Sequence, residues 1–180
     1  MPTHILLGVT GSIAAYRSAE LVSLARKRGH QVRVMMTEAA THFVGPTTFE
    51  ALSGEAVLLD TFRGTTSTMD HIEWAKWADI LVIAPLSANT LAKLACGLAD
   101  DALSTTTMAL PRGRPAVLAP AMNTEMWEHP AVQRNLRWLE ELGRYRIVAP
   151  VAKRLACGDV GVGGMEEPAH ILDEVEAALG

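Results

Sequence analysis

The chain has 180 residues, of which 49% are hydrophobic and 20% charged, and 16 Lys and Arg stand against 20 Asp and Glu. This composition is typical of a globular protein and excludes the disordered, collagenous and disulfide-scaffold classes. A net charge of −4 without basic runs indicates that the chain does not bind nucleic acid. Its apolar stretches are too short to span a membrane, and two cysteines in 180 residues favour a cytoplasmic, thiol-reduced protein.

Short apolar runs alternate with helical patterns along the whole chain. The central run, residues 80–84, carries no charge and ends at Pro85, which is typical of a buried parallel strand. Ser12 precedes the first helical pattern, Gly29 ends it, and Thr37 is placed to begin another helix. The predicted strands are 5–10, 31–36, 80–84, 115–119 and 147–148, and the predicted helices are 14–25, 46–52, 87–95, 100–109, 130–142 and 168–179.

This alternation predicts a single α/β domain over residues 1–180, with three layers and a parallel sheet in the middle. Ligands of such sheets bind beyond the carboxyl ends of the strands. Four loops leave these ends, and they begin at Thr10, Thr37, Pro85 and Pro120. The polar segment 61–69 is predicted to be a mobile or ligand-facing loop.

The first of these loops, G-V-T-G-S-I from Gly8, opens a helix and so presents backbone N–H groups that suit a phosphate. It lacks the glycine spacing of dinucleotide sites and of nucleoside triphosphate loops. Thr37 stands where a dinucleotide site would place a carboxylate against a ribose. A mononucleotide with one phosphate fits best, although an ordinary strand–helix turn explains the loop equally well.

The third and fourth loops carry small and amide side chains. Ser87 and Asn89 could hydrogen-bond a flat ring, or Ser87 could simply cap the following helix. Asn123 could recognise a carboxylate or an amide. Met122 could pack against a ring, although a methionine after a strand more often belongs to the core.

His71 and Cys157 are the candidate groups for proton transfer. His71 titrates near neutrality and lies beside carboxylates, which also suits an ordinary surface histidine. Cys157 lies in a glycine-dense segment where Lys153 and Arg154 could lower the thiol pKa. Cys96, by contrast, is expected to be buried and inert. The spacing of His, Cys and acidic residues predicts no metal site.

Four motifs occur in the order of a known family. They are G-V-T-G-S-I at Gly8, P-L-S-A-N-T at Pro85, P-A-M-N-T-E-M-W at Pro120 and A-C-G-D-V-G-V-G at Ala156. Together they resemble the flavin-dependent cysteine decarboxylases, which include phosphopantothenoylcysteine decarboxylases and lantibiotic peptidyl-cysteine decarboxylases. The resemblance covers nearly the whole chain.

The resemblance implies a flavodoxin-like, Rossmann-like fold that binds FMN and assembles as trimers or multiples of trimers, with the flavin near a subunit boundary. It implies that His71 assists proton removal, that Asn123 holds the substrate carboxylate and that Cys157 protonates the intermediate. The implied cofactor contacts are Gly11, Ser12, Thr37, Ser87, Ala88, Asn89, Thr90, Ser104 and Thr105, and the implied substrate contacts are Ala121, Met122 and Asn123.

The implied reaction is FMN-dependent decarboxylation of a small phosphorylated cysteine substrate, 4′-phosphopantothenoylcysteine, to the coenzyme A precursor 4′-phosphopantetheine. Oxidation of the thiol-bearing carbon provides an electron sink for the departing carboxyl group. The chain would be either a free-standing enzyme or one domain of a decarboxylase–synthetase fusion.

Three alternatives remain. Cys157 argues against a peptidyl-cysteine decarboxylase, the Pro120 motif argues against a flavin prenyltransferase, and the lack of a long acidic tail argues against a phosphatase-binding regulatory subunit. One position departs from the family, because Gly164 stands where an arginine is common. If that arginine helps to bind an anionic substrate, Arg154 or a neighbouring subunit would have to compensate.

Overall fold

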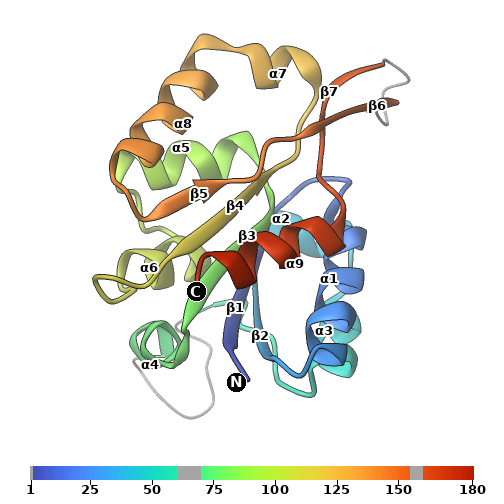
Figure 1. Ribbon diagram of the computed structural model, residues 1–180, viewed down its shortest axis with the longest axis vertical. Coiled ribbons are helices and arrows are strands. Elements are labelled where there is room, and N and C mark those ends of the chain that lie inside the picture. Colours follow the sequence, from blue (N-terminus) through green and yellow to red (C-terminus); the bar gives the residue numbers. More distant parts are fainter. Residues whose placement is uncertain (1, 61–69, 155–159) are drawn as a thin grey trace.

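Five parallel strands form the central sheet of the computed structural model, in the order β2-β1-β3-β4-β5 (Figure 1). The structure describes residues 2–60, 70–154 and 160–180. This strand order confirms the predicted α/β class and creates a topological switch point between β1 and β3. The strands are β1 (His4–Val9), β2 (Gln31–Met36), β3 (Ile80–Leu86), β4 (Ala116–Pro120) and β5 (Tyr145–Ile147).

Helices cover both faces of the sheet and give the three predicted layers. Along β1, Ile5 and Leu7 belong to one apolar core and Leu6 to the other, because successive strand side chains point to opposite faces. One face carries α1 (Ala15–Lys27), α3 (Pro46–Ser53) and α9 (Pro168–Ala177), and the other carries α4 (Asp70–Trp77), α5 (Ala88–Cys96), α6 (Ala102–Met108) and α8 (Pro130–Glu141).

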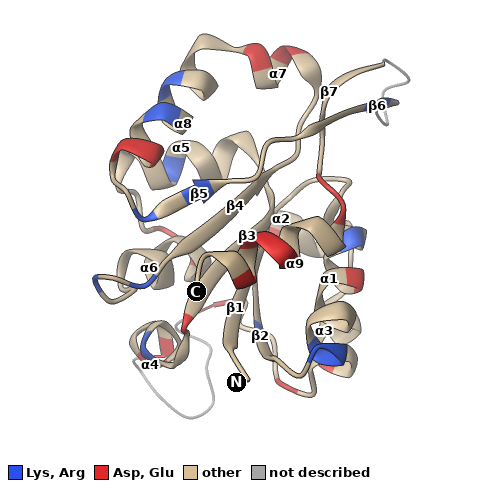
Figure 2. Ribbon diagram, in the orientation of Figure 1, with Lys and Arg blue, Asp and Glu red and all other residues tan. Residues whose placement is uncertain are grey.

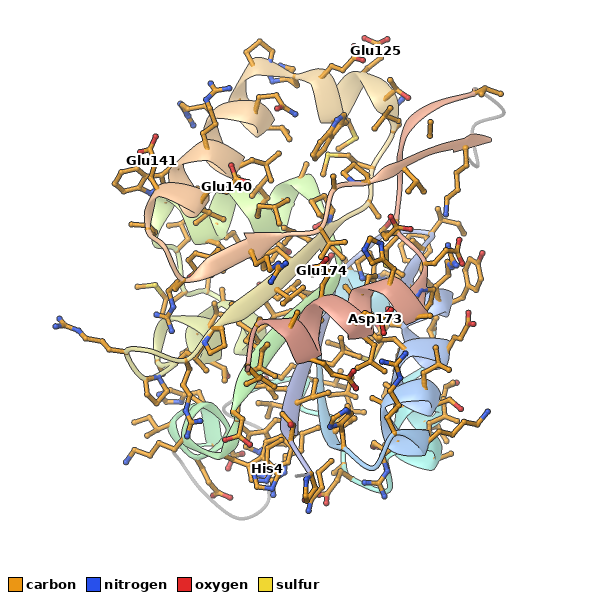
Figure 3. The ribbon with its side chains drawn as sticks, in the orientation of Figure 1. His4, Glu125, Glu140, Glu141, Asp173 and Glu174 are labelled. Atoms are coloured by element: carbon orange, nitrogen blue, oxygen red, sulfur yellow. The ribbon has the colours of Figure 1, made fainter. Side chains whose placement is uncertain are left out.

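Two ion pairs add to the apolar packing of α9, whose Asp173 and Glu174 are seen in Figure 3. Arg28 Nη1 lies 2.7 Å from Asp173 Oδ1, and Arg146 Nε lies 2.6 Å from Glu174 Oε2. These pairs connect α9 to the end of α1 and to β5. The last helix is therefore held over the same face of the sheet as the first.

The predicted helix start at Thr37 is confirmed, because Thr37 is the N-cap of the short helix α2 (Glu38–Thr41). Other elements were not predicted, namely the short helix α7 (Thr124–Glu128), the helix α4 and the antiparallel pair β6 (Val151–Arg154) and β7 (Val160–Gly164). The prediction that Cys96 is buried is wrong, because this last residue of α5 is exposed where the helix ends at the surface. None of the helices described here is long and apolar enough to cross a membrane.

Candidate functional site

A cavity of about 560 Å³ opens at the carboxyl ends of β1, β3 and β4. Its volume is in the range of small-molecule sites, and it lies beyond the carboxyl ends of the strands, as the sequence predicted, at the switch point between β1 and β3. Loops 10–14, 87–88 and 121–126 supply one part of its wall, and β6 and β7 supply another. The predicted residues that line it are Gly11, Ser12, Ser87, Ala88, Ala121, Met122 and Asn123.

Two buried hydroxyls fix the end of β3 beside the cavity. Thr10 Oγ1 donates to the carbonyl of Pro85 at 2.7 Å and accepts from the N–H of Ser87 at 2.8 Å. Ser18 Oγ donates to the carbonyl of Ala84 at 2.6 Å. The regular backbone pairing of β3 with β1 ends at Ile83, and Pro85 has no N–H to donate to the sheet. The hydroxyls of Thr10 and Ser18 therefore satisfy the carbonyls of Pro85 and Ala84 in place of backbone N–H groups. The strand therefore continues through Pro85 instead of ending there.

The first predicted loop meets the fourth at Ser12, whose hydroxyl donates to the carbonyl of Ala121 at 3.2 Å. Helix α1 begins with Ala14 as its N-cap, which makes no side-chain capping bond, so the predicted cap at Ser12 is two residues too early. A Cβ on Gly11 would lie 2.6 Å from the Cβ of Ala39, so α2 packs directly against this turn. Because Ala14, Tyr16 and Arg17 line the cavity, the N–H groups of the first turn of α1 lie at the cavity wall.

Ser87 serves both of the roles considered from the sequence. Its hydroxyl accepts from the N–H of Thr90 at 3.3 Å as the N-cap of α5, and Ser87 also lines the cavity. Ala88 lines the cavity beside it. Asn89 is exposed and Thr90 is buried, and neither lines the cavity.

Asn123 is exposed at the cavity and caps α7, with Oδ1 accepting from the N–H of Met126 at 2.9 Å. Its oxygen is thus engaged, and the amide NH₂ is the group that can donate to a ligand.

A backbone hydrogen bond holds β7 over the same loop, because Met122 N donates to the carbonyl of Gly163 at 2.9 Å. Gly163 has φ +150°, and a Cβ there would lie 2.2 Å from the carbonyl oxygen of Met122.

Several predicted cofactor contacts do not line this cavity. Thr37 is buried and caps α2 by accepting from the N–H of Ala40 at 3.3 Å. Ser104 is fully buried in a capping box with Asp101, and Thr105 donates to the carbonyl of Ala99 at 3.3 Å. These hydroxyls have structural partners within the chain, and their contacts with a cofactor stay predictions.

His71 lies in the first turn of α4 and away from the cavity, on the helix that leads into the amino end of β3 (Figure 1). Its Nδ1 is buried and has no hydrogen-bond partner within the described part of the chain. Cys157 lies outside the described residues. The structure therefore brings Asn123 to the cavity, but it does not bring His71 there within one chain.

Two basic residues also line the wall, Arg17 in α1 and Lys153 in β6. Arg17 was not identified from the sequence, and Lys153 was considered there only as a neighbour of the Cys157 thiol. Figure 2 shows basic residues at the end of β6 and at the start of α1, with acidic residues where β7 runs into α9. Lys153 Nζ donates to the carbonyl of Met165 at 3.0 Å, and Arg17 pairs with Glu167. Burial lowers the pKa of Lys153, and the nearby charge of Arg17 lowers this pKa further.

Metal binding finds no support in the described residues, among which no three His, Cys, Asp or Glu side chains are grouped to hold an ion. The predicted absence of a metal site stays a prediction.

Comparison with known proteins gives a consistent picture. A model of the Flavoprotein family matches residues 1–180. A probable phosphopantothenoylcysteine decarboxylase of Streptococcus mutans is 42% identical over 180 residues, covering 99% of this chain and 100% of that protein. The coenzyme A biosynthesis bifunctional protein CoaBC of Bacillus subtilis is 45% identical over 174 residues, covering 96% of this chain. The chain spans only 42% of that bifunctional relative.

Solved structures share the whole architecture. A PPC decarboxylase with a Cys→Ser substitution, complexed with pantothenoylaminoethenethiol, superposes with a TM-score of 0.86 at 37% identity and covers 98% of both chains. The FMN-dependent cysteine decarboxylase SpaF superposes with a TM-score of 0.81 at 37% identity, covering 98% of this chain and 97% of that chain.

Proposed function

The chain belongs to the flavoprotein family, and from that premise we propose that it decarboxylates 4′-phosphopantothenoylcysteine with FMN as cofactor. Membership confirms that the four sequence motifs were assigned to the right family. The observation that carries the proposal is the switch-point cavity, which the loops after β1, β3 and β4 line together. The full-length Streptococcus mutans relative supports the choice of substrate.

The cavity fits a flavin mononucleotide. Small residues, among them Gly11, Ala88 and Ala121, leave room for a planar ring between the loops. The first turn of α1 offers N–H groups to the phosphate of FMN. When bound, FMN supplies a two-electron acceptor that makes loss of the carboxyl group feasible.

Asn123 orients the substrate in this proposal. Its amide NH₂ donates to the substrate carboxylate, while α7 holds its oxygen at the N-cap. Because the amide is neutral, it orients the carboxylate without strongly stabilising the negative charge, which the carboxylate loses as carbon dioxide departs. Cys157 then donates a proton to the decarboxylated carbon skeleton.

His71 accepts a proton from the substrate, and this requires a second copy of the chain. Within one chain His71 lies on α4, away from the cavity, with its Nδ1 unpartnered among the described residues. We therefore include a homo-oligomer, built from trimers, in which His71 of one protomer completes the cavity of another. A closed symmetric assembly places every His71 against an equivalent cavity.

The test is release of carbon dioxide from 4′-phosphopantothenoylcysteine by the purified yellow protein. We expect His71→Asn to retain FMN but to block flavin bleaching by the substrate, whereas Cys157→Ser should bleach the flavin and release no finished product. Turnover of a peptide ending in cysteine, without turnover of the phosphorylated compound, would identify a peptidyl-cysteine decarboxylase instead. A colourless protein that takes up no added FMN would refute the proposal altogether.

A further inference from the structure

The cavity wall holds two cations that share one backbone oxygen. Lys153 Nζ and Arg17 Nη1 lie 3.0 Å and 3.3 Å from the carbonyl oxygen of Met165. Both side chains line the cavity, and none of the described residues that line it is acidic. Glu167 pairs with Arg17 from outside the cavity. The wall therefore presents positive charge to whatever fills the cavity.

Lys153 is the less compensated of the two cations. Burial lowers its pKa first, the charge of Arg17 lowers it further, and the acidic residues Glu167 and Glu166 offset only part of this effect. An ammonium group held beside a guanidinium in a partly desolvated wall gains most from an anion that approaches from the cavity.

The absence of a side chain at Gly164 leaves room for the stem of Lys153 at the cavity wall. A Cβ on Gly164 would lie 2.1 Å from Cε of Lys153 and 2.7 Å from both its Cδ and its Cγ. The lysine stem therefore occupies the space that any side chain at 164 would need. The sequence had suggested Arg154 or a neighbouring subunit as the replacement for an arginine at 164. The structure places the stem of Lys153, from the paired strand β6, over Gly164.

We propose that Lys153, supported by Arg17, binds the phosphate group of the phosphorylated substrate, and that Gly164 is required because the lysine stem lies over it. The inference rests on the proposed function. It assigns Lys153 to the phosphate because a cation on the departing carboxylate would stabilise the reactant more than the transition state, in which that charge leaves the carboxylate. A phosphate keeps its charge throughout the reaction, so its binding stabilises the reactant and the transition state equally.

The test compares phosphorylated and unphosphorylated ligands in the FMN-loaded protein. For Lys153→Met, we expect the Kd of 4′-phosphopantetheine, measured by calorimetry, to rise roughly 10- to 100-fold, since a charge-assisted hydrogen bond is lost. The Kd of pantetheine should change by less than about 3-fold. Lys27→Met, which removes an exposed lysine of α1, should change neither value. Lys153→Arg should retain most of the discrimination and covers the case that the methionine variant folds poorly.

Gly164 provides an independent arm of the test. Gly164→Ala should weaken phosphate binding as Lys153→Met does, because the added Cβ displaces the lysine stem. The double variant Lys153→Ala with Gly164→Arg should restore discrimination, because it returns a cation to the same space.

Two results would overturn the inference. Equal weakening of both ligands would show that Lys153 has no preference for phosphate. Loss of FMN affinity with riboflavin affinity unchanged would assign the lysine to the cofactor instead. A wild-type protein that prefers 4′-phosphopantetheine but releases no carbon dioxide would refute the proposed reaction and leave the Lys153 assignment standing.

Discussion

Replacing Thr10 by valine tests whether one buried hydroxyl holds the site together. Valine has nearly the same shape, so the change removes two hydrogen bonds without opening a cavity. The carbonyl of Pro85 and the N–H of Ser87 would both lose the partner that they have at 2.7 Å and 2.8 Å. An unsatisfied buried group costs about 1–3 kcal/mol. The N–H of Ser87 is only partly buried and should cost about 1 kcal/mol, so we expect a total loss of about 2–4 kcal/mol in the free energy of unfolding. For a chain of this length that lowers Tm by about 5–15 °C.

The matched control is Thr106→Val, which removes an equally buried hydroxyl that donates to the carbonyl of Ala102 at 2.7 Å. That carbonyl is also an acceptor within helix α6, so the expected loss is below about 1 kcal/mol. Urea unfolding of both variants gives the comparison, and FMN affinity gives a second measure. Equal losses in the two variants, or a Thr10 variant with unchanged FMN affinity, would refute the view that Thr10 positions the loop after β3.

Two further predictions concern charge and backbone shape. Burial raises the pKa of Asp101, but hydrogen bonds from Lys93 and Ser104 outweigh this effect, and the pKa lies below its usual value. Its stabilising effect is therefore present above the unfolded-state pKa and is lost as pH falls through the folded-state pKa. Asp101→Asn should cost about 1 kcal/mol at neutral pH, and this cost should shrink as pH falls through the folded-state pKa of Asp101, in urea unfolding across pH. Gly163→Ala should lower both Tm and FMN affinity, because its Cβ meets the Met122 carbonyl at 2.2 Å. Gly113→Ala, at φ +86° with no atom within 4 Å, should lower Tm alone.

The inner strands β1, β3 and β4 could be predicted because each is a short, mostly apolar run that is buried on both faces. Residues 80–84 carry no charge and form the first five residues of β3, and all seven residues of that strand are buried. The pair β6 and β7 could not be found in this way. Val160 is 81% exposed, and the glycines of β7 have no side chains to give a strand pattern. Their pairing depends on contacts with the loop after β4.

The loops of the site could also be predicted, because parallel strands bring their carboxyl ends to one edge of the sheet. The roles of Arg17 and Lys153 could not. In the sequence, Arg17 is one polar residue on an amphipathic helix, and its contact at Met165 lies 148 residues along the chain. Only the folded hairpin shows that Lys153 lies over Gly164, so the departure at 164 could be seen in the sequence but this contact could not.

The separation of His71 from the cavity leads to a prediction about mixed assemblies. His71→Asn keeps the cavity but loses the base, whereas Asn123→Ala keeps the base but loses the carboxylate contact, so neither variant alone should decarboxylate. If the base comes from a different protomer, random co-assembly of the two variants restores about one quarter of the sites, since each part is intact with a probability of about one half. Co-expression with two different affinity tags, followed by purification of doubly tagged oligomers, provides the sample. Recovery of carbon dioxide release would confirm the shared site. Doubly tagged oligomers without any activity would show that cavity and histidine belong to one protomer, and the proposed assembly would be wrong.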